Sequence, residues 1–222
     1  MSEAWVKARH DVFAVCRRIH EAGLVSGANG NVSVRVERGL LAITPSRVPW
    51  ARLQPEEVVI ADYEGEPVDG KGIPSSETMM HVAVYRARPD AGSVIHAHSP
   101  WAMVLAVAGL DIPPLIDEQV VYLGGVVRVA AYALPASEEL GRNALAALGD
   151  RRAALLRNHG VLVVGQTPDD AAAVCEQVER LAKTYVYARL LGNVNFLPEE
   201  ALEAELSIYK MAQMTQLTKE MR

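Results

Sequence analysis

The sequence has very little cysteine: Cys16 and Cys175 are the only two among 222 residues. Both lie in segments with helical periodicity, and their spacing matches no common metal motif. We therefore expect two reduced thiols buried in the core, which excludes a disulfide framework. Reduced thiols also favour a cytoplasmic location.

Positive charge and long apolar runs are scarce as well. The formal net charge is -5 at pH 7, and a chain of this charge would be repelled by a phosphate backbone, so nucleic acid is not expected as a partner. The N-terminal segment carries charges throughout and lacks the apolar core of a signal peptide. No run approaches the ~20 apolar residues that a membrane helix needs, so we expect no membrane partner.

Lysine is also rare. The five lysines are Lys7, Lys71, Lys183, Lys210 and Lys219. All lie in polar or amphipathic segments, whereas a Schiff-base lysine needs an apolar or cationic environment that lowers its pKa. Covalent lysine catalysis is therefore not predicted.

Half of the residues are apolar, which is enough for a sizeable core, and no linker composition divides the chain. We expect one domain over 1–222, with a charged helical tail from about residue 198 that docks late or on a neighbouring copy. Residues 111–125, interrupted by two prolines, are expected to form a loop.

The order of predicted elements indicates an α/β fold. Helical periodicity predicts helices over 3–21, 76–88, 100–109, 137–148 and 168–191, and apolar runs predict strands over 32–36, 40–44, 57–62, 92–98, 126–132, 153–156 and 161–165. The strands first follow one another and then alternate with helices, without a regular βαβ repeat. We therefore expect a single mixed, largely antiparallel central sheet with helices on both faces.

Two of the six histidines stand one residue apart in "SVIHAHSP", residues 93–100. In a strand, His96 and His98 would share a face. Two neutral imidazoles on one face suit zinc, and His159, at a predicted strand end in "RNHG", would add a third nitrogen. Three protein ligands leave a position for water or substrate, which is the catalytic pattern. Structural histidines are the alternative.

Three polar loops carry possible anion ligands. "PSSE" places Ser75, Ser76 and Glu77 where a helix begins, and the helix N-terminus favours an anion; an ordinary helix cap would explain the same residues. The other two loops are "GANGNVS", with Gly30 and Asn31, and "ITPSRVP", with Ser46 and Arg47. Grouped around a metal, these loops would hold a phosphorylated substrate. His81 shares a helix face with Glu77 and is expected to have a supporting role.

The motifs "GNVSVR", "ITPS", "PSSE", "HAHS" and "RNHG" stand in the order and approximate spacing of the class II aldolase/adducin family, which the chain resembles over about residues 5–192. The resemblance implies that His96, His98 and His159 bind zinc, with Mn²⁺ or Co²⁺ as alternatives. It implies that Glu77 is the catalytic acid/base and also contacts the metal when substrate is absent. The phosphate-site positions that it implies are Gly30, Asn31, Ser46, Arg47, Ser75 and Ser76.

The activity that the resemblance implies is zinc-dependent cleavage of a short ketose or deoxyketose 1-phosphate to dihydroxyacetone phosphate and an aldehyde. The enediolate formed in this reaction would be stabilised by the metal. Epimerisation of pentulose phosphates, dehydration and sugar-acid decarboxylation are alternatives within the family. A non-catalytic adducin-like module is the alternative of another class, although such modules lack the intact metal triad.

The resemblance also implies a homotetramer with active sites at subunit boundaries, where a neighbour's tyrosine donates a proton on the aldehyde side. Here the matching segment offers Asp117, Glu118 and Tyr122 instead of a clear match. We take Tyr122 and Glu118 as the candidates, and a core tyrosine and an exposed acid as the alternatives. Arg47 is a second departure, because a glycine stands there in the family pattern.

Overall fold

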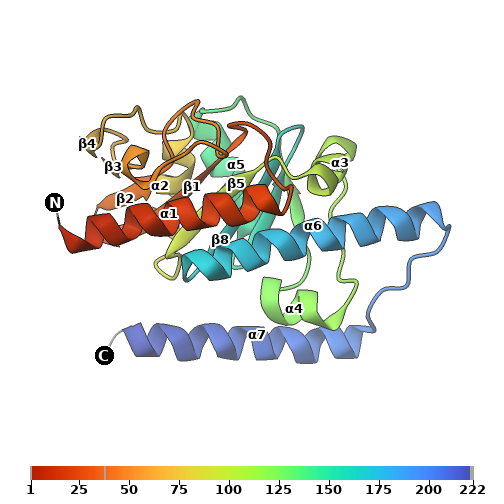
Figure 1. The fold of residues 1–222 in the computed structure, drawn as a ribbon. Coiled ribbons are helices and arrows are strands. Elements are labelled where there is room, and N and C mark those ends of the chain that lie inside the picture. Colours follow the sequence, from red (N-terminus) through yellow and green to blue (C-terminus); the bar gives the residue numbers. More distant parts are fainter. Residues whose placement is uncertain (1, 38, 221–222) are drawn as a thin grey trace.

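The computed structural model describes residues 2–37 and 39–220 (Figure 1). One eight-stranded sheet has the order β4-β3-β2-β1-β5-β8-β7-β6. The strands are β1 (Gly30–Glu37), β2 (Leu40–Ile43), β3 (Val59–Asp62), β4 (Pro67–Asp69), β5 (Ser93–Ala97), β6 (Arg128–Ala130), β7 (Ala153–Leu156) and β8 (Gly160–Gly165). Neighbouring strands are antiparallel except for the parallel pair β6–β7, so the predicted mixed, largely antiparallel sheet is confirmed.

Helices cover both faces of this sheet. The helices α1 (Glu3–Glu21), α3 (Pro100–Ala108) and α6 (Pro168–Leu190) bury their apolar sides on one face, and α2 (Thr78–Ala87) and α5 (Glu138–Leu148) on the other. Figure 1 shows α1 and α6 crossing in front of the strands. Successive side chains of β5 point to opposite faces of the sheet: Ile95 packs under α1 and α6, and Val94 packs under α2 and α5. His96 therefore points to the α2 side.

Two predicted elements were wrong in their extent, and one strand was missed. The segment 111–125 was expected to be a loop but contains α4 (Asp117–Leu123), which begins with two acidic residues and ends at Gly124 in a left-handed conformation. Its Gln119 is fully buried and bonds the carbonyls of Pro113 and Gly125, which holds the proline-rich turn against the helix. The expected strand 126–132 is limited to β6, and the short edge strand β4 was not predicted.

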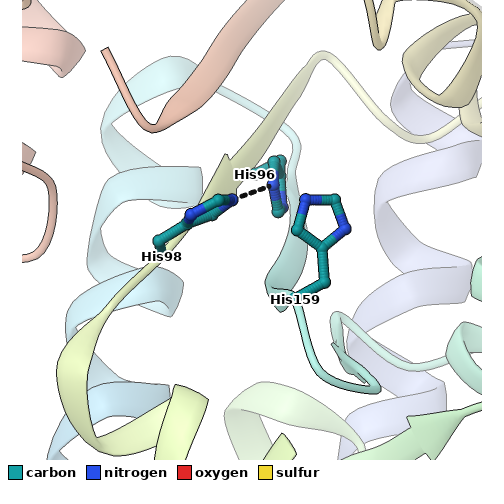
Figure 2. A group of neighbouring side chains, drawn as sticks. All are labelled: His96, His98 and His159. Carbon is teal, nitrogen blue, oxygen red and sulfur yellow. Dashed lines mark hydrogen bonds between the residues drawn. The ribbon is translucent and has the colours of Figure 1, made fainter. Parts of the chain in front are cut away.

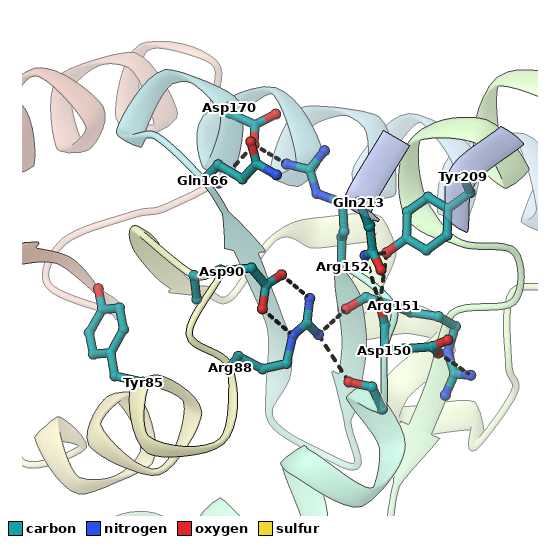
Figure 3. A network of polar contacts seen from close by, with 12 residues as sticks. Tyr85, Arg88, Asp90, Asp150, Arg151, Arg152, Gln166, Asp170, Tyr209 and Gln213 are labelled. Atoms are coloured by element: carbon teal, nitrogen blue, oxygen red, sulfur yellow. Dashed lines mark hydrogen bonds and ion pairs between the residues drawn. The ribbon is translucent and has the colours of Figure 1, made fainter. Parts of the chain in front are cut away.

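The C-terminal tail forms α7 (Glu199–Glu220), which packs along α4 of the same chain (Figure 1). Tyr209 is buried and donates a hydrogen bond to the Asp150 carbonyl at 2.8 Å, and Gln213 donates to the Tyr209 hydroxyl. Figure 3 shows this contact beside two ion pairs, Arg88–Asp90 and Arg152–Asp170. The predicted helical tail is confirmed, and a buried tyrosine anchors it.

Both cysteines are unpaired and buried, as expected. Burial raises the pKa of the Cys175 thiol to about 12, so this group stays protonated. Across residues 2–37 and 39–220, none of the helices combines the length and the apolar composition that crossing a bilayer requires.

Candidate active site

The three predicted histidine ligands converge at one end of β5 and β8 (Figure 2). His96 lies on β5, His98 directly follows that strand, and His159 lies on the turn that enters β8. Their ring centroids are 4.5 to 4.9 Å apart, and one nitrogen of each lies within 4.8 Å of the others. Tetrahedral zinc places its ligand nitrogens about 3.4 Å apart, so a small adjustment of the rings would close this site on an ion.

The turn at His159 is held in place by its neighbours. Asn158 adopts a left-handed conformation, φ 56°, which asparagine tolerates, and the His159 amide donates to the Leu156 carbonyl at 3.0 Å. Gly160 then passes so close to β5 that a β-carbon there would lie 2.4 Å from the Ala97 carbonyl oxygen. Only glycine allows β8 to bring His159 this near to the histidine pair.

The protonation states of His96 and His98 suit metal binding. The His96 Nδ1 atom lies 2.9 Å from the Val161 carbonyl, so Nδ1 carries the proton and Nε2 presents its lone pair to the cluster. Burial, together with the neighbouring imidazoles, lowers the pKa of His96 well below its ordinary value, and burial also lowers the pKa of His98. Neutral imidazole is the form that binds a divalent ion.

Glu77 closes the cluster from the N-cap position, directly before α2. Its Oε2 lies 3.4 Å from His96 Nε2 and its Oε1 lies 3.5 Å from His159 Nε2. Two buried atoms here, Glu77 Oε1 and His159 Nδ1, lack a hydrogen-bond partner within the part of the chain that the structure describes. Since buried polar atoms are nearly always partnered, these orphaned atoms and the three converging imidazoles fit a divalent cation.

The segment that follows His98 is fixed by a carboxylate from another helix. Glu179 on α6 accepts hydrogen bonds from the backbone amides of Trp101 and Ala102 at 2.8 and 3.0 Å. These amides belong to the first turn of α3, which has no side-chain cap of its own. The buried carboxylate therefore caps α3 and holds the end of "HAHS" in place.

The predicted phosphate loops lie beside the cluster. A β-bridge joins Pro45 to Pro74, and the Ser46 amide donates to the Ile73 carbonyl at 2.8 Å, so "ITPS" and "PSSE" run side by side. The Ser75 hydroxyl accepts from the Glu77 amide at 3.3 Å, a cap-like contact. Ser76 and Arg47 are exposed, and Arg47 has φ 63°, a conformation that favours the glycine of the family pattern.

The third loop enters β1, where Gly30 pairs with Ala97 and Asn31 pairs with His96. The Asn31 side chain bridges two groups: Nδ2 donates to Glu77 Oε2 at 2.8 Å, and Oδ1 lies 2.5 Å from His81 Nε2. His81 thus reaches Glu77 through Asn31. Two further residues of this buried network, Ser33 and Tyr85, were missed from the sequence. The available signals were a polar repeat of two along the strand and a repeat of four along the helix.

The two candidates for the aldehyde side lie elsewhere in the chain. Glu118 is exposed and pairs with Arg180 on α6 at 2.8 Å. Tyr122 is exposed on α4 and lines a cavity that includes Gly165 and Tyr209. That cavity is at the end of β8, about 17 Å along the strand from Gly160. The structure therefore does not bring Tyr122 or Glu118 to the histidines of their own subunit, and a role across a subunit boundary stays a prediction.

Comparison with known proteins identifies the class. A solved structure titled L-fuculose 1-phosphate aldolase superposes with a TM-score of 0.87 at 35% sequence identity, covering 95% of this chain and 98% of that one. The fold is that of a class II aldolase, and the chain is an enzyme of this type.

The sequence comparisons agree with this class. A 5-methylthioribulose-1-phosphate/5-deoxyribulose-1-phosphate aldolase from Rhodospirillum rubrum is 38% identical over 92% of each chain. A 5-deoxy-D-ribulose 1-phosphate aldolase from Bacillus thuringiensis serovar kurstaki is 35% identical over 89% of this chain and 92% of its own length. The family model described as "Class II Aldolase and Adducin N-terminal domain" matches residues 10–186, and the chain belongs to this family.

Proposed function

We propose that the protein is a zinc-dependent aldolase that cleaves a short ketose or deoxyketose 1-phosphate to dihydroxyacetone phosphate and an aldehyde. The observation that carries the proposal is the convergence of three histidines on one carboxylate, with polar loops beside them. Two of the relatives are named for 5-deoxyribulose 1-phosphate, and this sugar is the first substrate to test. L-Fuculose 1-phosphate is the second.

Cleavage breaks the C3–C4 bond of the ketose phosphate. The C4 hydroxyl loses its proton, C4 becomes the aldehyde carbon, and the bonding electron pair stays on C3 as an enediolate. A divalent ion held by His96, His98 and His159 would supply Lewis acidity toward the substrate oxygens. Glu77 delivers a proton to C3, which yields dihydroxyacetone phosphate; in the direction of synthesis it removes the same proton.

The phosphate group is held by the three loops. The hydroxyls of Ser46, Ser75 and Ser76, the guanidinium of Arg47 and the backbone at Gly30 offer donors, and the N-terminus of α2 adds a favourable dipole. Because "PSSE" leads directly into Glu77, binding of the phosphate there fixes the distance from C3 to the carboxylate. Binding energy from a part of the substrate that does not react is thereby used to align the carbon that does.

The general acid and base on the aldehyde side comes from a neighbouring subunit in this proposal. Tyr122 and Glu118 are its candidates, and both are exposed on α4. The assembly would be a homotetramer with active sites at the subunit boundaries. The two unpaired cysteines suit a reducing, cytoplasmic compartment.

The test is a screen of ketose 1-phosphates and sugar-acid phosphates, with and without a chelator, that detects dihydroxyacetone phosphate and carbon dioxide separately. Release of the triose phosphate from 5-deoxyribulose 1-phosphate, lost with the chelator and restored by zinc, is the expected result. Release of carbon dioxide without the triose phosphate would show that the enzyme is a decarboxylase and would overturn the proposed aldol cleavage. Purified protein that contains no divalent ion and cannot take one up would contradict the proposed metal dependence.

A further inference from the structure

A buried chain of polar side chains leads from Glu77 into the layer between the sheet and α2. Two of its members, Asn31 and Ser33, are two residues apart on β1. The other three are spaced four residues apart, with Glu77 at the N-cap of α2 and His81 and Tyr85 within the helix. Two residues of a strand advance about 6.7 Å, and four residues of a helix advance about 6.0 Å. The nearly equal steps let the strand and helix residues interleave into one continuous row of hydrogen bonds.

The contacts of this row are short throughout. Asn31 Nδ2 lies 2.8 Å from Glu77 Oε2, and Asn31 Oδ1 lies 2.5 Å from His81 Nε2. His81 Nδ1 lies 2.6 Å from the Ser33 hydroxyl, which is 2.8 Å from the Tyr85 hydroxyl. All five residues are buried, so each polar atom needs a partner inside the protein.

The direction of every bond follows from the first one. Glu77 Oε2 accepts from the Asn31 amide group, so Asn31 Oδ1 faces His81 and must accept from it. Burial lowers the pKa of His81 to about 3, so its imidazole is neutral and carries one proton, which lies on Nε2.

The unprotonated Nδ1 of His81 then accepts from Ser33, and Ser33 accepts from Tyr85. Burial raises the pKa of Tyr85, which keeps this last donor protonated. Every proton of the chain therefore points toward Glu77.

We propose that His81, Ser33 and Tyr85 are positioning residues that hold the amide of Asn31 with Nδ2 on Glu77 Oε2 and so assign proton transfer to Oε1. Oε2 accepts from Asn31, whereas Oε1 faces His159 and has no hydrogen-bond partner within residues 2–37 and 39–220. Without the donor at His81 Nε2, the Asn31 amide is free to turn its oxygen toward the carboxylate. Asn31 Oδ1 and Glu77 Oε2 are both acceptors and would repel each other, which would displace the Glu77 carboxylate. The inference rests on the proposed role of Glu77 as the group that moves the proton at C3.

The experiment compares two substitutions of one side chain. His81→Gln keeps a donor near the position of Nε2, and His81→Asn keeps an acceptor near the position of Nδ1 but loses the donor to Asn31. The readout is the exchange of the C3 hydrogen of dihydroxyacetone phosphate with deuterium from solvent, followed by proton NMR on the zinc-loaded enzyme. This exchange isolates the Glu77 step and needs no aldehyde, so the identity of the sugar does not affect it.

We expect His81→Asn to lower kcat for exchange by about 10²-fold, as a misplaced group does, with KM and zinc content unchanged. His81→Gln is expected to retain most of the rate. If His81 had a purely structural role, the exchange rates of the two variants would follow their melting temperatures, regardless of whether a donor to Asn31 remains. Equal losses in both variants would overturn the proposal. Tyr63→Phe, which removes a hydroxyl outside the chain, is the control and is expected to leave exchange unchanged.

A second measurement needs neither substrate nor activity. Nitrogen-15 NMR of the histidine rings in the intact protein reports which nitrogen of His81 carries the proton, and Nε2 is expected. In Ser33→Ala the donor to Nδ1 is gone, and the preference for this tautomer is expected to weaken. A His81 proton on Nδ1 in the unmodified protein would refute the direction of the chain, even where the proposed substrate proved correct. An inactive protein with the proton on Nε2 would instead count against the proposed substrate alone.

Discussion

Gly160 passes close to β5 at the candidate metal centre, and its substitution by alanine tests the site most directly. The added β-carbon would lie 2.4 Å from the Ala97 carbonyl oxygen, 3.1 Å from His96 Cε1 and 3.2 Å from His98 Cδ2. Side chains essentially never approach closer than 3.0 Å in this way. β8 and β5 must therefore separate by at least about 0.6 Å, which exceeds the ~0.5 Å tolerance of a functional site.

The expected effect of Gly160→Ala has two parts. Overpacking of this kind costs about 1 to 3 kcal/mol of the free energy of unfolding. The separation moves His159 away from His96 and His98, and we expect zinc affinity to fall about 10- to 100-fold, the range seen when the support of a ligand is lost. Competition with a metal indicator measures the affinity, and denaturant unfolding measures the stability.

The matched control is Gly141→Ala in α5. A β-carbon there meets only ordinary contacts, the nearest at 3.4 Å, and alanine favours a helix by about 1 kcal/mol over glycine. We expect this variant to be as stable as the unmodified protein or more so, with unchanged zinc affinity. Unchanged zinc affinity in Gly160→Ala would show that the two strands do not need this contact to assemble the ligands, and would refute the reasoning.

Four further outcomes are expected. Glu77→Gln should bind zinc normally and lose about 10²- to 10⁴-fold in exchange at C3; full activity would remove Glu77 from the mechanism. His159→Ala should purify with far less zinc by metal analysis, and a fully metallated variant would contradict its assignment as a ligand. Glu179→Ala should lose about 1 to 3 kcal/mol in denaturant unfolding, because one buried and one partly buried amide at the start of α3 lose their acceptor; an unchanged midpoint would show that the cap is not needed. Folding lowers the pKa of His81 to about 3, so the unfolded chain binds more protons than the folded chain below pH 6.5. The free energy of unfolding of the metal-free protein should therefore fall toward pH 4, by roughly 3 kcal/mol more than that of His81→Gln. Parallel curves of stability against pH for the two proteins would contradict this.

Local patterns were enough to predict the three histidines that the structure brings together. A strand period of two accounts for His96 and His98, and the turn after β7 accounts for His159. The adjacency of β1 and β5 could not be predicted from periodicity, because the paired residues Asn31 and His96 are far apart in the sequence. The position of Asn31 between Glu77 and His81 depends on that pairing, and so the chain that continues to Ser33 and Tyr85 became visible only in the structure.

The segment 111–125 shows why other elements escaped prediction. The paired prolines indicated a loop, but the acidic first turn and the final glycine of α4 are helix signals of equal strength. The helix is stabilised by tertiary contacts that are not local, since it packs between α6 and α7. Residues that act across a subunit boundary are harder still, because nothing in the order of one chain says which surface of a second copy will face them.

The equal step of β1 and α2 also limits how these two segments can change in evolution. Deleting one residue between Glu77 and Tyr85 would rotate the rest of the helix by about 100° and turn His81 or Tyr85 away from the strand. Deleting one residue between Asn31 and Ser33 would send Ser33 to the opposite face of the sheet. Changes in chain length are therefore expected outside these two segments, where they leave the spacing around Glu77 unchanged.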